Sequence, residues 1–385
     1  MLGSMRAALL FGWCLTFGAP LPSFRAYTVS KDLKMGYQLA AVDVNGDKRI
    51  DLIAVDERGT ELAWFENPGW DRHVIAADVP RTINIDAADI DGDGVPEIAI
   101  LYKFESRPDR SVGIVSLLKH DGDPRRPWKE TKLDQVPTAH RVRWLDLDGK
   151  GSKVMIMAPM VGLKAEPPKY EATVPIYIYR PPAWKREVLS EELSGVLHSI
   201  YPVDWDARGG QELLTAGFNG LRLFRPSKDA GAPWRSEAIA AGIPEECPRC
   251  GSSEIVRGRL GKSWFLAAIE PWHGNQVTVY RKKGGSWQRL VIEDSFQNGH
   301  ALAVGDLNGD GRDEIVAGFR GKGFQLYYYS AEDKNGSRWT RHVLDAGGIA
   351  AADCKIRDFN RDGVADVACS GASTGNIVFY EGVRK

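Results

Sequence analysis

Four short acidic strings carry the side chains best suited to bind a metal ion. They read DVNGDKRID, DIDGDGVPE, DLNGDGRDE and DFNRDGVAD, and each has oxygen-bearing side chains at positions 1, 3, 5 and 9. This is the spacing of the first part of a calcium loop, in which alternate side chains turn inward and position 7 supplies a carbonyl. An apolar, strand-like segment follows each string, so these are not EF-hands. The predicted ligands are Asp43, Asn45, Asp47, Asp51, Asp89, Asp91, Asp93, Glu97, Asp306, Asn308, Asp310, Glu314, Asp358, Asn360, Asp362 and Asp366.

Histidines at a repeated position form a second set of candidate functional residues. His140, His198 and His300 each stand six residues before the first acidic residue of an acidic string or of a degenerate copy, and His273 lies in a predicted turn. Imidazoles can transfer protons or bind a divalent transition metal near neutral pH. We expect a site formed by these four histidines and Arg320, with His198 or His300 as the base and the other histidines as metal-binding or hydrogen-bonding partners. The alternative is that polar residues at this position only hydrate the interior of the fold.

The elements that must position these residues repeat along the chain. An aromatic residue, then polar residues and an apolar strand end, recur every 50 to 58 residues, and a weaker copy begins at Phe24. A period of this length with four strand-like segments is typical of β-propeller blades. The sequence therefore predicts an all-β fold, a seven-bladed β-propeller of four-stranded antiparallel blades. The six clear copies begin at Trp70, Trp128, Trp184, Trp234, Trp287 and Trp339.

The two ends of the chain are expected to complete one blade. The last unit stops after its third strand, at Tyr380, and the copy at Phe24 supplies the missing fourth strand. The N-terminal strand would then close the ring by pairing with the C-terminal blade, which leaves no open sheet edge. We expect a single propeller over residues 23–385. Its innermost strands are predicted to start near residues 37, 83, 140, 198, 253, 300 and 352.

The repeat assigns the four complete acidic strings to blades 1, 2, 6 and 7. In blades 3 and 4, Lys150 and Arg208 stand at the fifth loop position, and blade 5 has lost the pattern. Because a basic side chain would put its charge where the cation binds, we expect about four structural calcium ions, in the neighbouring blades 6, 7, 1 and 2. The alternative is that the strings form hydrogen-bonded turns without metal.

The same repeat separates two faces. The acidic loops open on one face, whereas the starts of the innermost strands and the turns between second and third strands open on the other. The candidate histidines should therefore meet at one mouth of the central channel, with Arg58 and Asn219 beside them. Two long connections, 103–110 and 162–173, are expected to wall or cover this mouth. Tyr170, in the second connection, is a candidate for stacking on a sugar ring.

The N-terminus indicates export. Residues 1–22 have the form of a secretory signal peptide, with Arg6 before an apolar run that is too short to span a bilayer comfortably. No other stretch is long and apolar enough to span, so we expect no transmembrane segment. The mature chain is predicted to be soluble and either periplasmic or extracellular. The alternative is a cytosolic protein with an apolar N-terminus.

Four cysteines follow the signal peptide, an even number that suits an oxidising compartment. Cys354 and Cys369 flank the last acidic loop at nearly opposite positions of a hairpin, so we expect a cross-strand disulfide. Cys247 and Cys250 form one CxxC motif without the second pair that a zinc site would need. That favours a local disulfide over redox or metal chemistry.

Composition excludes several functions. The net charge is −1 and no long basic block occurs, so neither nucleic acid nor an anionic membrane is an expected partner. No pair of catalytic carboxylates indicates a glycosidase, and no nucleophile elbow or Ser/Cys constellation is present.

The repeated acidic loops resemble FG-GAP or VCBS repeats, the blade type of integrin α-subunits and of many exported bacterial proteins. More weakly, the histidine positions and phrases such as Val196-Leu-His-Ser-Ile and Glu270-Pro-Trp-His-Gly are similar to the propeller part of aldos-2-ulose dehydratase. That resemblance implies a carbohydrate or small-molecule substrate and a lyase that removes water from a keto-sugar; the cupin-type domains of that enzyme are missing. A non-catalytic propeller that binds glycan or a protein partner is the alternative.

Overall fold

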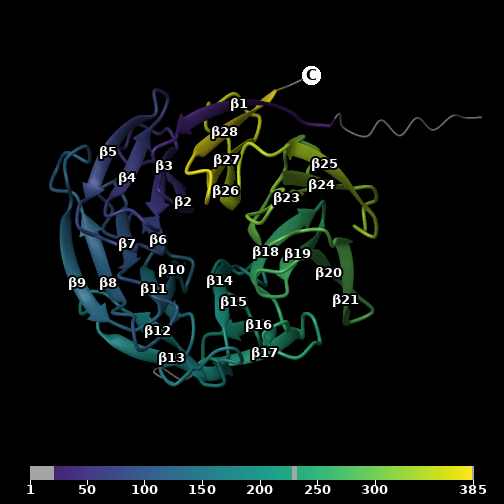
Figure 1. Ribbon diagram of the computed structural model, residues 1–385, viewed down its shortest axis with the longest axis horizontal. Helices are drawn as coiled ribbons and strands as arrows, with labels where there is room; N and C mark the ends of the chain where they lie inside the picture. Colours follow the sequence, from purple (N-terminus) through teal and green to yellow (C-terminus); the bar gives the residue numbers. More distant parts are fainter. Residues whose placement is uncertain (1–20, 228–231, 384–385) are drawn as a thin grey trace, which may run out of the picture.

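The computed structural model describes residues 21–227 and 232–383, which form a closed ring of seven four-stranded sheets (Figure 1). Neighbouring strands within every sheet run antiparallel, and the described residues contain no helix. The predicted seven-bladed, all-β propeller is therefore confirmed. No helix in the described part of the chain could cross a membrane. Residues 1–20 of the predicted signal peptide lie outside the described residues.

The first strand of each blade lines the centre of the ring (Figure 1). All seven begin within one residue of the predicted positions. They are β2 (Gly36–Val42), β6 (Asn84–Ala88), β10 (Ala139–Asp146), β14 (Leu197–Val203), β18 (Glu254–Leu260), β22 (Gly299–Gly305) and β26 (Ala351–Arg357).

Second and third strands form the middle of each blade. The second strands are β3 (Asp51–Asp56), β7 (Glu97–Tyr102), β11 (Lys153–Pro159), β15 (Glu212–Gly217), β19 (Ser263–Glu270), β23 (Glu314–Phe319) and β27 (Asp366–Gly371). The third strands are β4 (Leu62–Glu66), β8 (Ile114–Lys119), β12 (Thr173–Tyr179), β16 (Gly220–Arg225), β20 (Gln276–Lys283), β24 (Leu326–Ala331) and β28 (Ile377–Val383). Every residue of β7, β15, β23 and β27 is buried, as expected for strands covered on both faces.

Outer strands complete the blades and face solvent. They are β5 (Asp71–Ala76), β9 (Lys129–Gln135), β13 (Arg186–Ser194), β17 (Arg235–Ala240), β21 (Ser286–Glu293), β25 (Trp339–Asp345) and β1 (Ser23–Ser30). β1 pairs with β28, so the N-terminal strand supplies the outer strand of blade 7. The predicted closure of the ring is confirmed.

Aromatic and aliphatic side chains fill the spaces between adjacent blades. At the junction of blades 7 and 1, the ring of Trp70 lies 6.3 Å from that of Phe359 and 5.6 Å from that of Phe379. A second cluster joins blades 3 and 4 through residues such as Ile178 and Phe224. Burial of these apolar surfaces fixes the angle between blades, and with it the positions of the inner strands.

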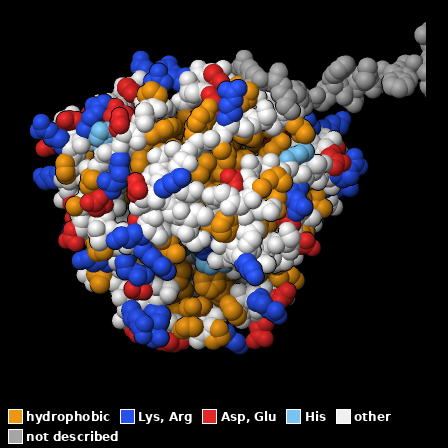
Figure 2. Space-filling view, turned by 45° about the horizontal axis from the view of Figure 1, so that its top comes forward, with side chains coloured by type: hydrophobic (Ala, Val, Ile, Leu, Met, Phe, Trp, Pro, Cys, Tyr) orange, Lys and Arg blue, Asp and Glu red, His pale blue; other side chains and the backbone are white. Residues whose placement is uncertain are grey.

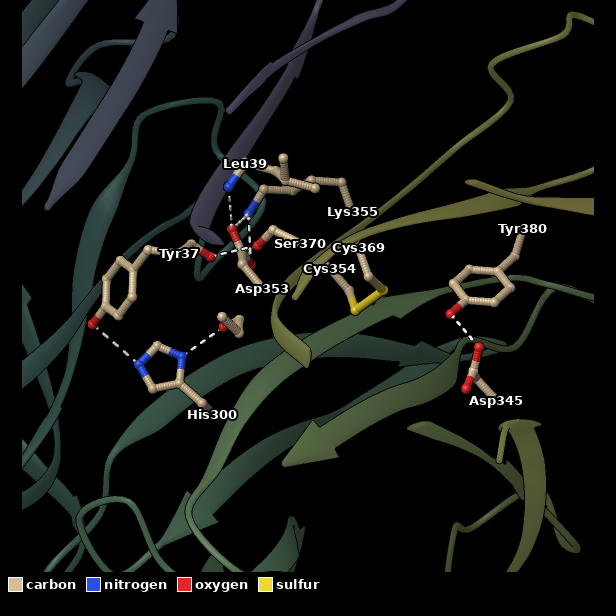
Figure 3. Close-up of a disulfide and its surroundings, with 11 residues drawn as sticks. Tyr37, Leu39, His300, Asp345, Asp353, Cys354, Lys355, Cys369, Ser370 and Tyr380 are labelled. Atoms are coloured by element: carbon tan, nitrogen blue, oxygen red, sulfur yellow. Dashed lines mark hydrogen bonds and ion pairs between the residues drawn. A yellow bond between two sulfur atoms is a disulfide. The ribbon is translucent and has the colours of Figure 1, made fainter. Parts of the chain in front are cut away.

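Both expected disulfides are present. Cys354 and Cys369 are directly opposite each other on β26 and β27, where they cross-link the last blade close to the channel (Figure 3). Cys247 and Cys250 form a local bridge in the connection between β17 and β18.

Candidate functional site

Four histidines gather at the mouth of the channel, around His198. The centroid of its ring lies 5.0 Å from that of His140, 4.8 Å from that of His273 and 5.3 Å from that of His300. His140, His198 and His300 are buried, and His273 is partly exposed. Figure 2 shows a histidine beside an arginine or lysine at the edge of a hollow among hydrophobic side chains. The structure thus brings together the four histidines that the sequence singled out.

A β-bulge turns three of these histidines toward one another. In β10, β14 and β22 the pairing with the second strand skips one residue, and the skipped residues are His140, His198 and His300. A bulge leaves its extra residue outside the ladder and re-aims its side chain. The same irregularity occurs at Ala352 in β26, so the bulge is a feature of the repeat. In three blades the bulged position is a histidine.

His198 is oriented by an acidic residue of the next blade. Its Nδ1 lies 3.0 Å from Oε1 of Glu254 and 3.1 Å from Oγ of Ser253, and its Nε2 lies 3.1 Å from Nε2 of His273. Because an ionised carboxylate can only accept, these partners assign the proton of His198 to Nδ1. Nε2 then carries the lone pair, which accepts a hydrogen bond from the Nε2–H of His273.

His300 is held in a similar way. Its Nδ1 lies 2.5 Å from the carbonyl oxygen of Ala352, and its Nε2 lies 3.1 Å from the hydroxyl of Tyr37 (Figure 3). The carbonyl requires a protonated Nδ1, so Nε2 accepts a hydrogen bond from Tyr37. The pair therefore places a phenolic proton beside an imidazole in the mouth of the channel.

His273 reaches the cluster from the connection between β19 and β20. Its φ angle is 49°, in the left-handed region that a residue with a side chain adopts at a cost of about 1–2 kcal/mol. Its backbone N–H donates to Oγ of Ser253, 3.3 Å away, and the centroid of its ring lies 5.0 Å from that of Trp272. Strain of this kind is common where a side chain must be held in a functional position.

Burial keeps these imidazoles neutral. It lowers the pKa of all four histidines, and the charge of Arg141 or Arg320 lowers each pKa further. Burial alone would raise the pKa of Glu254, but Arg141 and His198 lower it to about 2. At neutral pH the cluster therefore consists of neutral imidazoles beside an ionised carboxylate.

Sequence reasoning missed Glu254 and Arg141 as members of the site. Nη2 of Arg141 lies 2.9 Å from Oε1 of Glu254, so these buried charges neutralise each other across the channel mouth. Arg141 follows His140 directly, and Glu254 follows Ser253, the residue that occupies the histidine position in blade 5. Comparison of the position after the repeated histidine between blades is the signal that would have identified both.

Arg320 lies at the same mouth, as expected. Its guanidinium carbon is 5.9 Å from the centroid of the Tyr37 ring, on the connection that follows β23. Two other expected members take different places. Arg58 is exposed, and Asn219 accepts a hydrogen bond from the backbone N–H of Ser194 at 2.9 Å and lines a separate pocket.

Two separate cavities lie near the histidine cluster. A cavity of about 40 Å³, lined in part by Tyr37, Glu254 and His300, lies against the histidines and is too small for a sugar ring. A pocket of about 490 Å³ lies beside the connection 162–173, where Phe218 forms part of its wall.

Three aromatic rings link this pocket to the histidines. The ring of Tyr170 contacts those of Phe218 and Trp272 edge to face, at 6.5 Å and 5.9 Å, and Trp272 packs on His273. The connection 162–173 thus walls the mouth, as predicted. Tyr170 is partly buried in this aromatic group.

Three of the imidazoles could hold a metal. Ring nitrogens of His198, His273 and His300 lie within 4.8 Å of one another. Nδ1 of His198 faces the carboxylate of Glu254, and Nδ1 of His300 faces the backbone carbonyl of Ala352. Histidines that bind a metal through one ring nitrogen usually donate the other N–H to such a group. The donor set fits a divalent transition metal such as zinc.

The acidic loops share one backbone fold. In blade 1 the carboxylate of Asp43 accepts hydrogen bonds from the N–H groups of Gly46 and Lys48, at 2.8 Å and 2.7 Å. Equivalent bonds hold the loops of blades 2, 3, 4, 6 and 7. Since blade 3 lacks the full ligand set and folds alike, the backbone conformation by itself does not identify a calcium loop.

Carboxylates at the ninth loop position show where a cation would fit best. Asp51, Glu314 and Asp366 are buried beside other carboxylates of their loops. Burial raises the pKa of Asp51 to about 7, that of Glu314 to about 8 and that of Asp366 to about 6. A bound cation would remove this penalty, so the donor sets of blades 1, 6 and 7 fit calcium.

Blade 2 has a cation of its own. The ammonium of Lys119, at the end of β8, contacts Asp91, lies 3.3 Å from Asp93 and lies 2.7 Å from Glu97. The residues that pair at the same place in blades 1, 6 and 7 are Glu66, Ser330 and Glu381. Lys119 thus occupies the space between ligands of the blade 2 loop. The acidic groups of blade 4, Asp204, Asp206 and Glu212, also lie close together, with Arg208 at the edge beside Asp206.

Comparisons with known protein families agree with both resemblances seen in the sequence. Residues 112–283 match the β-propeller domain of aldos-2-ulose dehydratase, and residues 43–100 and 306–369 match the FG-GAP-like repeat. The first match contains His140, His198 and His273, and the second contains all four complete acidic loops.

Two curated proteins show sequence similarity. Aldos-2-ulose dehydratase of Phanerodontia chrysosporium is 26% identical over 305 residues, which cover 69% of this chain and 33% of that protein. Rhamnogalacturonan endolyase YesW of Bacillus subtilis is 25% identical over 252 residues, which cover 60% of this chain and 36% of that protein. The matched parts thus span about a third of the length of these relatives.

Solved structures share the fold. BBS1N, determined in complex with ARL6DN, matches 95% of this chain and 97% of its own with a TM-score of 0.59 at 12% identity. An Agrocybe aegerita lectin that recognises non-reducing terminal N-acetylglucosamine matches 91% of this chain and 86% of its own with a TM-score of 0.53 at 13% identity. Identities this low support the architecture alone.

Proposed function

We propose that this protein is a carbohydrate lyase that removes water from a keto-sugar at the histidine cluster. The observation that carries the proposal is His198, whose Nδ1–H faces the ionised Glu254 and whose Nε2 bears the lone pair that a general base needs. The names of the two similar curated proteins, a dehydratase and a lyase of carbohydrates, both denote eliminations and support the reaction class.

In the proposed elimination a carbonyl acidifies the neighbouring C–H bond. Nε2 of His198 takes that proton, and the electron pair moves to the carbonyl oxygen, where Arg320 stabilises the enolate. The carbonyl then re-forms, a carbon–carbon double bond appears, and the β-hydroxyl leaves with a proton from the Tyr37–His300 pair. Substrate becomes unsaturated sugar and water, so neither an oxidant nor a reductant is needed.

A divalent metal held by His198, His273 and His300 would add Lewis-acid polarisation of a substrate oxygen. In that case His198 could no longer act as the base, and His140 is the imidazole that remains outside the metal-binding set. Its Nε2 lies 3.2 Å from Nη1 of Arg141, and its Nδ1 is buried without a hydrogen-bond partner. Because a guanidinium only donates, the lone pair of Nε2 accepts a hydrogen bond from Arg141 and Nδ1 carries the proton.

Enzyme assays with histidine variants test the proposal. D-glucosone, a 2-keto aldose, serves as the probe, and ultraviolet absorbance of the conjugated carbonyl reports the product. His198→Gln and His300→Gln should lose turnover, and the melting temperature shows whether each variant is folded. His342→Gln, on the outer strand β25, is the matched control. Full turnover by His198→Gln, or none by the unaltered protein, would refute the proposed reaction.

A second candidate is a non-catalytic propeller that binds glycan or a protein partner. The observation that favours it is burial: His140, His198 and His300 are only 2%, 1% and 5% exposed. A substrate could reach them only from the side of His273. Binding of a glycan without any turnover would support this candidate.

We also propose that the protein is exported to the periplasm or outside the cell and carries structural calcium in its acidic loops. The two disulfides support export, because such bonds persist in oxidising compartments. The buried ninth-position carboxylates of blades 1, 6 and 7 support calcium. Lys119 competes for the fourth expected site, in blade 2.

A further inference from the structure

Arg320 is a partly exposed cation whose hydrogen bonds are incomplete. Its Nη2 donates to Oδ1 of Asn298 at 3.1 Å, but its Nε is buried and has no hydrogen-bond partner. Its guanidinium lies over the ring of Tyr37, which faces His300. The Nε–H of Arg320 therefore lacks an acceptor at the mouth of the channel.

No carboxylate among the described residues lies within ion-pair distance of Arg320. Arg141, the other guanidinium of the mouth, is neutralised by Glu254 at 2.9 Å. The nearby Glu57 lies 3.7 Å from Arg81, which also contacts Glu105 at 3.3 Å. Of Arg141 and Arg320, only Arg320 therefore lacks a carboxylate in direct contact, and a partly buried charge without a direct counter-ion is costly.

We infer that the missing counter-ion belongs to the substrate: the site takes a sugar that bears a carboxylate, bound by Arg320. A planar guanidinium binds a carboxylate through two parallel hydrogen bonds, and an unpaired Nε–H can supply one of them. The single charge of Arg320 matches a carboxylate, whereas a phosphate ester carries up to two negative charges at neutral pH. The inference rests on the proposed function, because it names the class of substrate for the same site.

Direct binding tests the inference. D-galacturonate and D-glucuronate are compared with D-galactose, D-glucose and glucose 6-phosphate by calorimetry at low salt. We expect the two uronates to bind at least about tenfold more tightly than the neutral sugars, in line with a charge-assisted hydrogen bond. Arg320→Gln should abolish this difference, and Arg320→Lys, which keeps the charge but loses the planar fork, should reduce it.

A matched control separates a specific contact from general attraction. Arg81→Gln removes the same charge from the same face, at an arginine that already has carboxylate partners, and should keep the preference for uronates. The melting temperature of each variant shows whether it is folded, and Arg320→Lys carries the test if Arg320→Gln is not. Equal affinity for uronates and neutral sugars, or a uronate preference that survives in folded Arg320→Gln, overturns the inference, as does tighter binding of glucose 6-phosphate.

The same measurements separate this inference from the proposed function. Turnover of D-glucosone without any preference for uronates leaves the elimination in place and removes the acidic substrate. Uronate binding that depends on Arg320, without turnover of any sugar, supports the acidic ligand and removes the elimination.

Discussion

Glu254→Gln is the substitution whose effect the structure defines best. The carboxylate of Glu254 lies between Arg141, at 2.9 Å, and His198, at 3.0 Å, and its side chain is 17% exposed. Burial alone would raise its pKa, but Arg141 and the hydrogen bond with His198 lower it from 4.5 to about 2. That difference corresponds to roughly 3 kcal/mol of favourable interaction. A neutral amide loses this interaction and leaves Arg141 buried without a counter-ion.

We therefore expect Glu254→Gln to lower the free energy of unfolding by about 3 kcal/mol, within the range for breaking a buried ion pair. Urea unfolding followed by tryptophan fluorescence measures it. Glu237→Gln is the control, because Glu237 pairs with Arg225 at 2.7 Å on the surface and should contribute roughly 0.5 kcal/mol or less. Equal stability of the two variants would show that Glu254 does not hold the mouth together.

Three further perturbations test the proposed calcium sites and the disulfides. A chelator should lower the melting temperature, because the buried carboxylates of blades 1, 6 and 7 would repel each other without a cation, and added calcium should restore it. Lys119→Met should make the melting temperature more sensitive to the chelator, because blade 2 then depends on calcium as well. A melting temperature that the chelator leaves unchanged, in the unaltered protein and in Lys119→Met, would argue against calcium. Replacement of Cys354 and Cys369 by serine should lower the free energy of unfolding by about 3 kcal/mol, because the bridge closes a loop of 15 residues. Replacement of Cys247 and Cys250, which are only 3 residues apart, should lower it less. Denaturant titration under non-reducing conditions compares the two.

The repeat made the architecture predictable. Tryptophans at a regular spacing gave the number of blades, and the acidic strings gave the register, which located the innermost strands to within one residue. Because equivalent positions of a propeller converge on its axis, the register also placed His140, His198 and His300 at one mouth. The missing fourth strand of the last unit predicted the pairing of β1 with β28.

The rest of the site depends on contacts between blades, which the repeat does not encode. Glu254 of blade 5 reaches Arg141 of blade 3, 113 positions earlier in the chain. Both stand at the position after the repeated histidine, but nothing in the sequence shows that these two residues pair. The bulges that turn the histidines inward are likewise irregularities of pairing. The place of Lys119 in the blade 2 loop could not be predicted either, because Lys119 belongs to β8 and not to the acidic string that it contacts.

The pairing of β1 with β28 sets the order in which the chain can finish folding. Tyr27 and Glu381, which form a hydrogen bond across this pair, are 354 positions apart. β1 must therefore wait until β28 has been synthesised, while the other blades form from neighbouring segments. Contacts of such long range are slow to form. If the protein crosses a membrane unfolded, as the proposed export implies, β1 and β28 cannot pair until translocation ends. Closure of the ring would then be the last step of folding.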